Sequence, residues 1–185
     1  MAGPTNVTDM LAPQIIDRST ELLKLVQSER VHALADYWRG KLAGRVMPAR
    51  ADIDPSEMRA LLPFVALADV TAGPLEVRFR LGGEAICDSY RCNVAGRLLA
   101  DLDPPGGVAM WMAAFDRVIA GTQPVIGQLR ASFSGSDRFV EWAMLPLSGD
   151  GRTVHQVLQI EDWHALHRVP RDERYAVTWR VEIFD

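Results

Sequence analysis

The residues best suited to acid–base or metal chemistry are four histidines, two of which have a notable spacing. His164 and His167 stand three positions apart, next to Glu161 and Asp162, and a helical turn would place both rings on one side. The zinc-binding order H-E-x-x-H is absent, however, and polar residues after a last strand are commonplace on protein surfaces. We therefore predict no metal site.

His155 lies in a segment that alternates like a strand, where we expect a hydrogen-bonded structural imidazole. An enzyme would need a pair of titratable groups that converge on a cavity. The candidate acidic partners are Glu84, Asp88, Asp101 and Glu141. No spacing assembles such a pair from these residues, and the G-x-S-x-G, P-loop and G-x-G-x-x-G motifs are missing. We predict no catalytic residue and no enzymatic activity.

Composition and charge indicate one globular domain. Of the 185 residues, 48% are hydrophobic and 24% are charged, and the net charge of −4 gives no electrostatic footprint for nucleic acid. No secretory signal is evident, and no stretch approaches the ~20 apolar residues of a membrane helix. We expect a cytoplasmic protein that binds no nucleic acid and does not span a membrane. Cys87 and Cys92 are too few for a zinc site and are expected to be free, buried thiols.

The N-terminal part is helical in pattern, with an apolar stripe of period 3.6 between Asp17 and Leu42. The stripe consists of Val31, Leu34, Ala35, Trp38 and Leu42. Leu22, Leu23 and Val26 lie off it, so the helix either kinks near Ser28 or has two apolar faces. Gly44 is placed to end the helix in a left-handed conformation.

A proline-bordered connector follows from Met47 to Asp54. Pro48 and Pro55 favour extended backbone in the residues before them, which predicts a rigid, extended segment. Asp54 is the expected N-cap of a short helix that starts at Pro55 and ends at Pro63. The polar residues of the connector, Arg50, Asp52 and Asp54, either recognise a ligand or partner or pin the connector against the sheet. The structural role is favoured.

The rest of the chain alternates like a sheet interrupted by helices. The expected strands are Val65–Val70, Leu75–Leu81, Val125–Phe133, Arg138–Leu147 and Thr153–Ile160. The expected helices are Glu84–Tyr90 and Val108–Ala120, the latter ending at Gly121. Asp162–His167 is expected to leave the sheet, and Tyr175–Ile183 alternates like one more strand.

The connector also carries a family resemblance. The run Met47-Pro-Ala-Arg-Ala-Asp-Ile-Asp-Pro55, preceded by Tyr37-Trp38 and followed by Leu62-Pro63, resembles the opening of PAS_5, a bacterial PAS-domain family known mostly from alphaproteobacteria. The likeness continues through four later landmarks: Arg78-Phe-Arg-Leu-Gly-Gly83, Gly96-Arg97, Pro124 and Pro146-Leu147-Ser148. It spans roughly Val31 to Ile160.

The resemblance and the element order predict the same fold. We expect an α+β fold with a PAS-like five-stranded antiparallel sheet, helices on one face and an N-terminal helical extension. Residues 1–44 would form the extension and residues 45–162 the PAS-like domain. Residues 163–185 would form a tail that can add a strand.

The resemblance implies a sensory or regulatory protein of bacterial signal transduction that binds a small ligand, a protein partner or both. No kinase, cyclase or DNA-binding pattern occurs in these residues, so a signal would leave through an unidentified protein partner. The alternative is a ligand-free dimerisation or adaptor module, and a small enzyme that uses the PAS pocket ranks below both. The cofactor is unknown: Tyr90-Arg-Cys-Asn93 lacks the Asn-Cys-Arg-Phe-Leu-Gln motif of flavin-binding photosensory PAS domains.

A PAS-like sheet curls around a cavity bounded by its helices, which makes nine residues candidates for a ligand pocket. They are Phe79, Leu81, Ile86, Leu99, Leu102, Trp111, Phe115, Trp142 and His155. Such a pocket would take a small apolar ligand. The alternative is that the large aromatic side chains fill the space as ordinary core.

Four aliphatic residues predict a homodimer. Leu22, Leu23, Leu25 and Val26 precede the region of resemblance and have no evident partner in their own chain. Left in water, they would form an apolar patch of the kind that marks an interface. Pairing the N-terminal helices of two copies would bury that patch.

Overall fold

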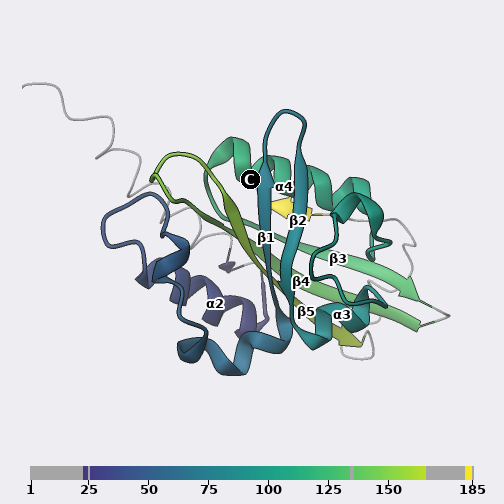
Figure 1. Cartoon of the computed structure of the whole chain (residues 1–185). Coiled ribbons are helices and arrows are strands. Elements are labelled where there is room, and N and C mark those ends of the chain that lie inside the picture. The colour runs from purple at the N-terminus through teal and green to yellow at the C-terminus, as the bar shows by residue number, and fades with distance from the viewer. Residues whose placement is uncertain (1–22, 25, 134–135, 166–181, 185) are drawn as a thin grey trace, which may run out of the picture.

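The structure is a computed structural model that describes residues 23–24, 26–133, 136–165 and 182–184 (Figure 1). Its helices are α2 (Glu29–Gly40), α3 (Glu84–Ser89) and α4 (Val108–Gly121). Its short 3-10 helices are η1 (Arg50–Asp52), η2 (Pro55–Phe64) and η3 (Leu99–Asp101). Its strands are β1 (Val65–Thr71), β2 (Glu76–Gly82), β3 (Val125–Phe133), β4 (Ser136–Leu147), β5 (Gln156–Ala165) and β6 (Glu182–Phe184).

The strands form one antiparallel sheet in the order β2-β1-β5-β4-β3-β6. Strands β1 to β5 are the five that the sequence predicted, and they make the expected PAS-like α+β fold. The sixth strand, β6, pairs with β3 through Ile126 and Phe184. Most of the predicted strand Tyr175–Ile183 lies outside the described residues. No helix in the described part of the chain is long and apolar enough to cross a membrane.

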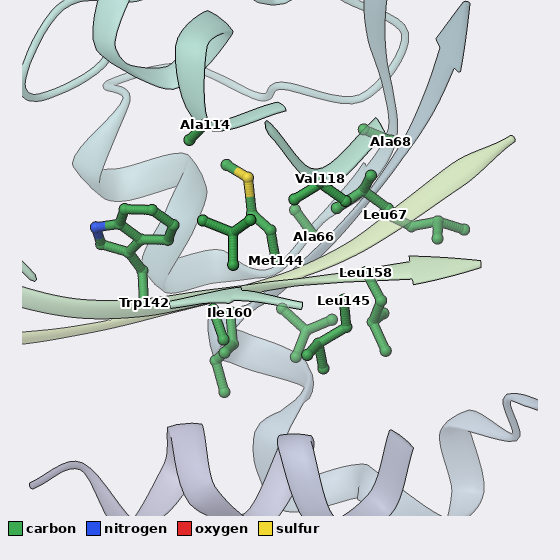
Figure 2. Close-up of a cluster of buried hydrophobic side chains, with 14 of the residues drawn as sticks. Ala66, Leu67, Ala68, Ala114, Val118, Trp142, Met144, Leu145, Leu158 and Ile160 are labelled. Atoms are coloured by element: carbon green, nitrogen blue, oxygen red, sulfur yellow. The ribbon is translucent and has the colours of Figure 1, made fainter. Parts of the chain in front are cut away.

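Helices cover both faces of the sheet. Side chains alternate between the two faces of each strand. In Figure 2, Trp142 and Met144 point towards α4, whereas Leu145 and Ile160 point away from it, towards the helix on the opposite face. That opposite helix is α2, which contacts β4 and β5. The N-terminal extension therefore covers the face that the helices after β2 leave open.

Helix α2 begins at Glu29 with Ser28 as its N-cap, and Ser28 is the place where a kink was one of the two predicted alternatives. The Ser28 side chain accepts a hydrogen bond from the backbone N–H of Val31 (3.1 Å), which is a standard N-cap. The predicted apolar stripe is buried, and the Trp38 indole donates to the carbonyl of Pro146 (2.9 Å). The helix ends at Gly40, earlier than predicted, and Gly44 (φ +81°) lies in the turn that follows.

The premise of the dimer prediction is wrong for two of its four residues. Leu23 and Val26 are buried in the core of their own chain. Leu22 and Leu25 lie outside the described residues. The two aliphatic side chains therefore already have partners, and their apolar character does not require a second copy of the chain.

The connector is not wholly extended as predicted, because it contains the single turn η1. Asp52 stabilises this turn: its carboxylate accepts from the backbone N–H of Ala49 (2.7 Å) and pairs with Arg45 (2.7 Å). The carbonyl of Pro48 accepts from the backbone N–H of Ser148 (2.9 Å), which ties the connector to the turn between β4 and β5. These contacts support the structural role of Asp52.

Asp54 caps η2 as predicted. Its Oδ1 accepts from the backbone N–H of Ser56 (2.8 Å), and Pro55 occupies the first helical position. We expect Asp54→Ala to lower the free energy of unfolding by about 1 kcal/mol, because the N–H of Ser56 loses its acceptor. A lower melting temperature would report the loss. Arg59→Ala, an exposed change in the same helix, is the control, and an unchanged melting curve for Asp54→Ala would contradict the prediction.

Two element boundaries also differ from prediction. Helix α4 includes Gly121, and the left-handed residue that follows it is Thr122 (φ +52°). Strand β5 was predicted to run from Thr153 to Ile160 but runs from Gln156 to Ala165, so the expected departure of 162–167 is wrong for 162–165. The reason is the length of β4, which supplies pairing partners along the whole of β5.

Candidate functional site

A buried polar cluster lies on the α4 face of the sheet, around the carboxylate of Glu161. Glu161 Oε1 accepts from the Tyr90 hydroxyl (3.1 Å) and from Gln159 Nε2 (2.6 Å). Its Oε2 accepts from the indole nitrogen of Trp163 (3.0 Å). We call these four residues the Glu161 cluster. Three donors thus converge on one side chain that is fully buried.

The strand period and one glycine contact position the cluster. Gln159, Glu161 and Trp163 are alternate residues of β5, so they share a face. Glu161 pairs with Trp142 of β4, which points towards α4 in Figure 2. Tyr90 reaches the cluster as the C-cap of α3. Helix α3 starts after Gly83, where a Cβ would lie 2.1 Å from the carbonyl oxygen of Leu62, so only glycine permits this approach.

Burial dominates the electrostatics of the cluster. It raises the pKa of Glu161 to about 7, although the three hydrogen bonds from Trp163, Tyr90 and Gln159 act in the opposite direction. Burial, the charge of Glu161 and their mutual hydrogen bond raise the pKa of Tyr90 well above 10. Tyr90 therefore stays a hydroxyl donor at neutral pH, whereas Glu161 changes charge near it.

Two further polar atoms beside the cluster are buried without a partner. The indole nitrogen of Trp142 and Oε1 of Gln159 have no hydrogen-bond partner among the residues that the structure describes. Trp142 is the cross-strand partner of Glu161, and Gln159 belongs to the cluster itself. The indole nitrogen is a hydrogen-bond donor and the amide oxygen is an acceptor. Together they could bind a molecule that carries one acceptor and one donor.

Aromatic and aliphatic side chains surround this polar centre. The Trp111 and Trp142 rings lie 5.3 Å apart in a tilted arrangement, and Phe79 meets Tyr90 edge to face at 6.1 Å. Seven of the nine predicted pocket residues are buried in the core. They are Phe79, Ile86, Leu99, Leu102, Trp111, Phe115 and Trp142. Their role in ligand binding remains a prediction.

The structure places Leu81 and His155 outside this interior. A bulge at Arg80 makes Leu67 and Ala68 of β1 pair with Leu81 and Phe79 of β2, which resets the alternation and leaves Leu81 41% exposed. His155 precedes β5 and is exposed, and its Nδ1 accepts from the backbone N–H of Gly149 (3.2 Å). The prediction that both residues line the interior is wrong.

Four residues of the site were missed from the sequence: Tyr90, Gln159, Glu161 and Trp163. The alternation of Gln159, Glu161 and Trp163 carried the signal, but polar residues at a predicted strand end suggested a surface. In the structure β5 continues past them, so the same residues face the core. Within the described part of the chain, no group of three or more metal-ligating side chains occurs, and His167 lies outside it.

A second set of contacts lies directly behind the cluster, on the α2 face. Asp162, the neighbour of Glu161, is buried and accepts from Ser28 Oγ (2.6 Å) and from Arg30 (2.7 Å). Its cross-strand partner Glu141 accepts from the backbone N–H of Gln27 (2.9 Å). Two adjacent acidic residues of β5 thus serve opposite faces, one in the interior and one at the start of α2.

The match to a protein family agrees with this architecture. The family model PAS_5, described as a PAS domain, matches residues 26–160. No curated protein matches. Among solved structures, a chain of the Vibrio cholera VqmA–ligand–DNA complex is similar, with a TM-score of 0.47 and 10% sequence identity. The match covers 60% of this chain and 51% of that chain, so it spans only about half of that protein.

Proposed function

Because the chain belongs to the PAS_5 family of PAS domains, we propose that it is a sensory or regulatory module that binds a small molecule between the sheet and α4. The observation that supports this role is the pair of unpartnered buried atoms, Trp142 Nε1 and Gln159 Oε1, among the described residues. Leaving a buried polar group unpaired costs about 1–3 kcal/mol. A ligand that accepts from the indole and donates to the amide would remove that cost.

The chemistry of the surroundings narrows the class of ligand. The sequence suggested an apolar molecule, but the Glu161 cluster adds a polar end to an otherwise aromatic interior. We propose a small, flat molecule with one hydrogen-bond acceptor, one donor and apolar edges. It would lie against Trp111 and Trp142 and direct its polar atoms at Trp142 of β4 and Gln159 of β5.

Occupancy of the interior would be reported through α2. Glu161 and Asp162 are consecutive on β5, so a shift of the strand at the cluster also moves the acceptor that holds Ser28 and Arg30. A protein partner that contacts the start of α2 would sense this shift. A homodimer through the N-terminal segment also stays a prediction, which sedimentation velocity would test.

Native mass spectrometry of freshly purified full chain tests ligand binding directly. The ligand would be a retained small molecule, or one found by a thermal-shift screen of small heteroaromatic compounds. We expect it to bind about tenfold more weakly to Trp142→Phe and to Gln159→Met than to the wild-type chain. Trp142→Phe removes the indole N–H together with part of the ring. Gln159→Met keeps the length of the side chain but removes both amide atoms, including the Nε2 that donates to Glu161. One lost hydrogen bond to the ligand is worth ~1 kcal/mol.

Met144→Leu is the matched control, because Met144 pairs with Gln159 on the same face and carries neither polar atom. It should keep wild-type affinity. Equal affinity for all variants would contradict the proposed site. If the wild-type chain binds none of these compounds, the two atoms are served by water, and the ligand-free adaptor becomes the better description.

A further inference from the structure

The two cysteines occupy the two ends of one helix-terminating turn. Helix α3 has Tyr90 as its C-cap, and Arg91 after it is left-handed (φ +56°). The backbone N–H of Cys92 donates to the carbonyl of Cys87 (3.1 Å), and that of Arg91 donates to the carbonyl of Asp88 (3.2 Å). These two bonds define a Schellman motif, in which the side chains at the positions of Cys87 and Cys92 commonly touch.

This turn holds the cysteines within disulfide range. Standard bond lengths and the 3.1 Å hydrogen bond limit the separation of the two Cα atoms to about 7 Å. Disulfides span Cα separations of roughly 4.4–6.8 Å. Both thiols are free, and both are half-buried rather than buried as the sequence predicted, so solvent reaches them. The Cys87 thiol donates to the carbonyl of Gly82 (3.5 Å), so the side chain points towards the end of β2 and must rotate to reach Cys92.

One of the four residues between the cysteines belongs to the interior site. Tyr90 is both the C-cap that the turn encloses and a donor to Glu161 (3.1 Å). Burial and Glu161 are the main causes of the raised pKa of Tyr90, and Cys92 lies close enough to make a smaller electrostatic contribution. Closing or opening a covalent bond across this turn therefore acts on a residue of the Glu161 cluster.

We propose that Cys87 and Cys92 form a reversible dithiol–disulfide site whose oxidised form fixes Tyr90 on the Glu161 cluster. With a peroxide as oxidant, one thiolate attacks an oxygen atom, breaks the O–O bond and becomes a sulfenic acid while the first water forms. The second thiol then attacks that sulfur, the S–S bond forms, and the second water leaves. Two electrons pass from the two thiols to the peroxide. A small-molecule thiol reverses the reaction by thiol–disulfide exchange.

Oxidation of the full chain with hydrogen peroxide tests the bond. Intact mass should fall by two hydrogen masses, with a Cys87–Cys92 linkage in peptide maps, and dithiothreitol should restore the original mass. Cys87→Ser and Cys92→Ser should instead gain oxygen or form dimers linked through the remaining thiol. Stable oxygen adducts on both cysteines of the wild-type chain, or linkage between chains, would overturn the proposal.

Hydrogen exchange of the reduced and oxidised chain tests the effect on Tyr90. The amides of residues 86–92 should exchange roughly tenfold more slowly in the oxidised chain, since the bond restricts opening of the turn. The amides of α4 should be unaffected and serve as the internal control. Equal exchange rates of residues 86–92 in the reduced and oxidised chains would overturn the proposed effect of the disulfide on Tyr90. Neither measurement uses a ligand, so its failure is distinct from failure of the proposed function.

Discussion

Replacing Phe115 by alanine should lower the free energy of unfolding by about 3–5 kcal/mol, the usual cost of truncating a buried aromatic side chain. Phe115 lies on the buried face of α4 and is fully enclosed. Its removal deletes apolar contacts and leaves a cavity between the helix and the sheet. Urea denaturation monitored by circular dichroism would measure the change.

Leu81→Ala is the matched control, because the sequence placed both residues in the same interior and the structure exposes Leu81 by 41%. It should cost less than about 1 kcal/mol, as is usual for surface changes. If Phe115→Ala were equally mild, the space around Phe115 would be loosely packed. The alternative in which these aromatic residues simply fill the core would then be wrong.

The free energy of unfolding should fall by about 3 kcal/mol as the pH rises from about 4.5 to above 7, through the contribution of Glu161. The ordinary pKa of a glutamate is 4.5, and burial raises the pKa of Glu161 to about 7 in the folded protein. The folded state therefore holds the proton more tightly than the unfolded state. This contribution is fully present below pH 4.5 and is lost as the pH passes the folded pKa. Urea denaturation at several pH values would measure it.

Glu161→Gln tests whether Glu161 causes this pH dependence of the free energy of unfolding, because glutamine has a similar shape and does not titrate. The variant should lose the decrease in stability between about pH 4.5 and 7, whatever its absolute stability. Glu76→Gln, on the exposed surface of β2, should retain the decrease because Glu161 is still in place. A wild-type pH dependence in Glu161→Gln would mean that another group carries it.

The same titration connects stability to the proposed function. Below the folded pKa the Glu161 cluster is neutral, and above it the interior carries one negative charge held by Tyr90, Gln159 and Trp163. A ligand with a positive charge or a strong donor would favour the ionised form. Binding measured on both sides of pH 7 would therefore show which protonation state the ligand selects.

Local sequence patterns determined the secondary structure and the family. Periodicity predicted α4 and β3 and, as one of two alternatives, a kink near Ser28, and cap chemistry predicted the N-cap at Asp54. These features depend on neighbours within a few residues, where hydrogen bonds and side-chain period are fixed by the chain itself. The connector motif likewise identified the PAS family without a structure.

Only the tertiary structure decided which of these residues form the site. The bulge at Arg80 is a mismatch between two strands, so it cannot be seen in β2 alone, yet it moves Leu81 to the surface. The length of β4 extends β5 past Ile160, and this turns two expected surface residues inward, so that Glu161 is buried and Trp163 is partly buried. Tyr90 joins them from a position 71 residues earlier in the chain. Burial and strand pairing depend on residues that are distant in sequence. A local sequence pattern therefore does not reveal the strand register that brings Tyr90, Glu161 and Trp163 together.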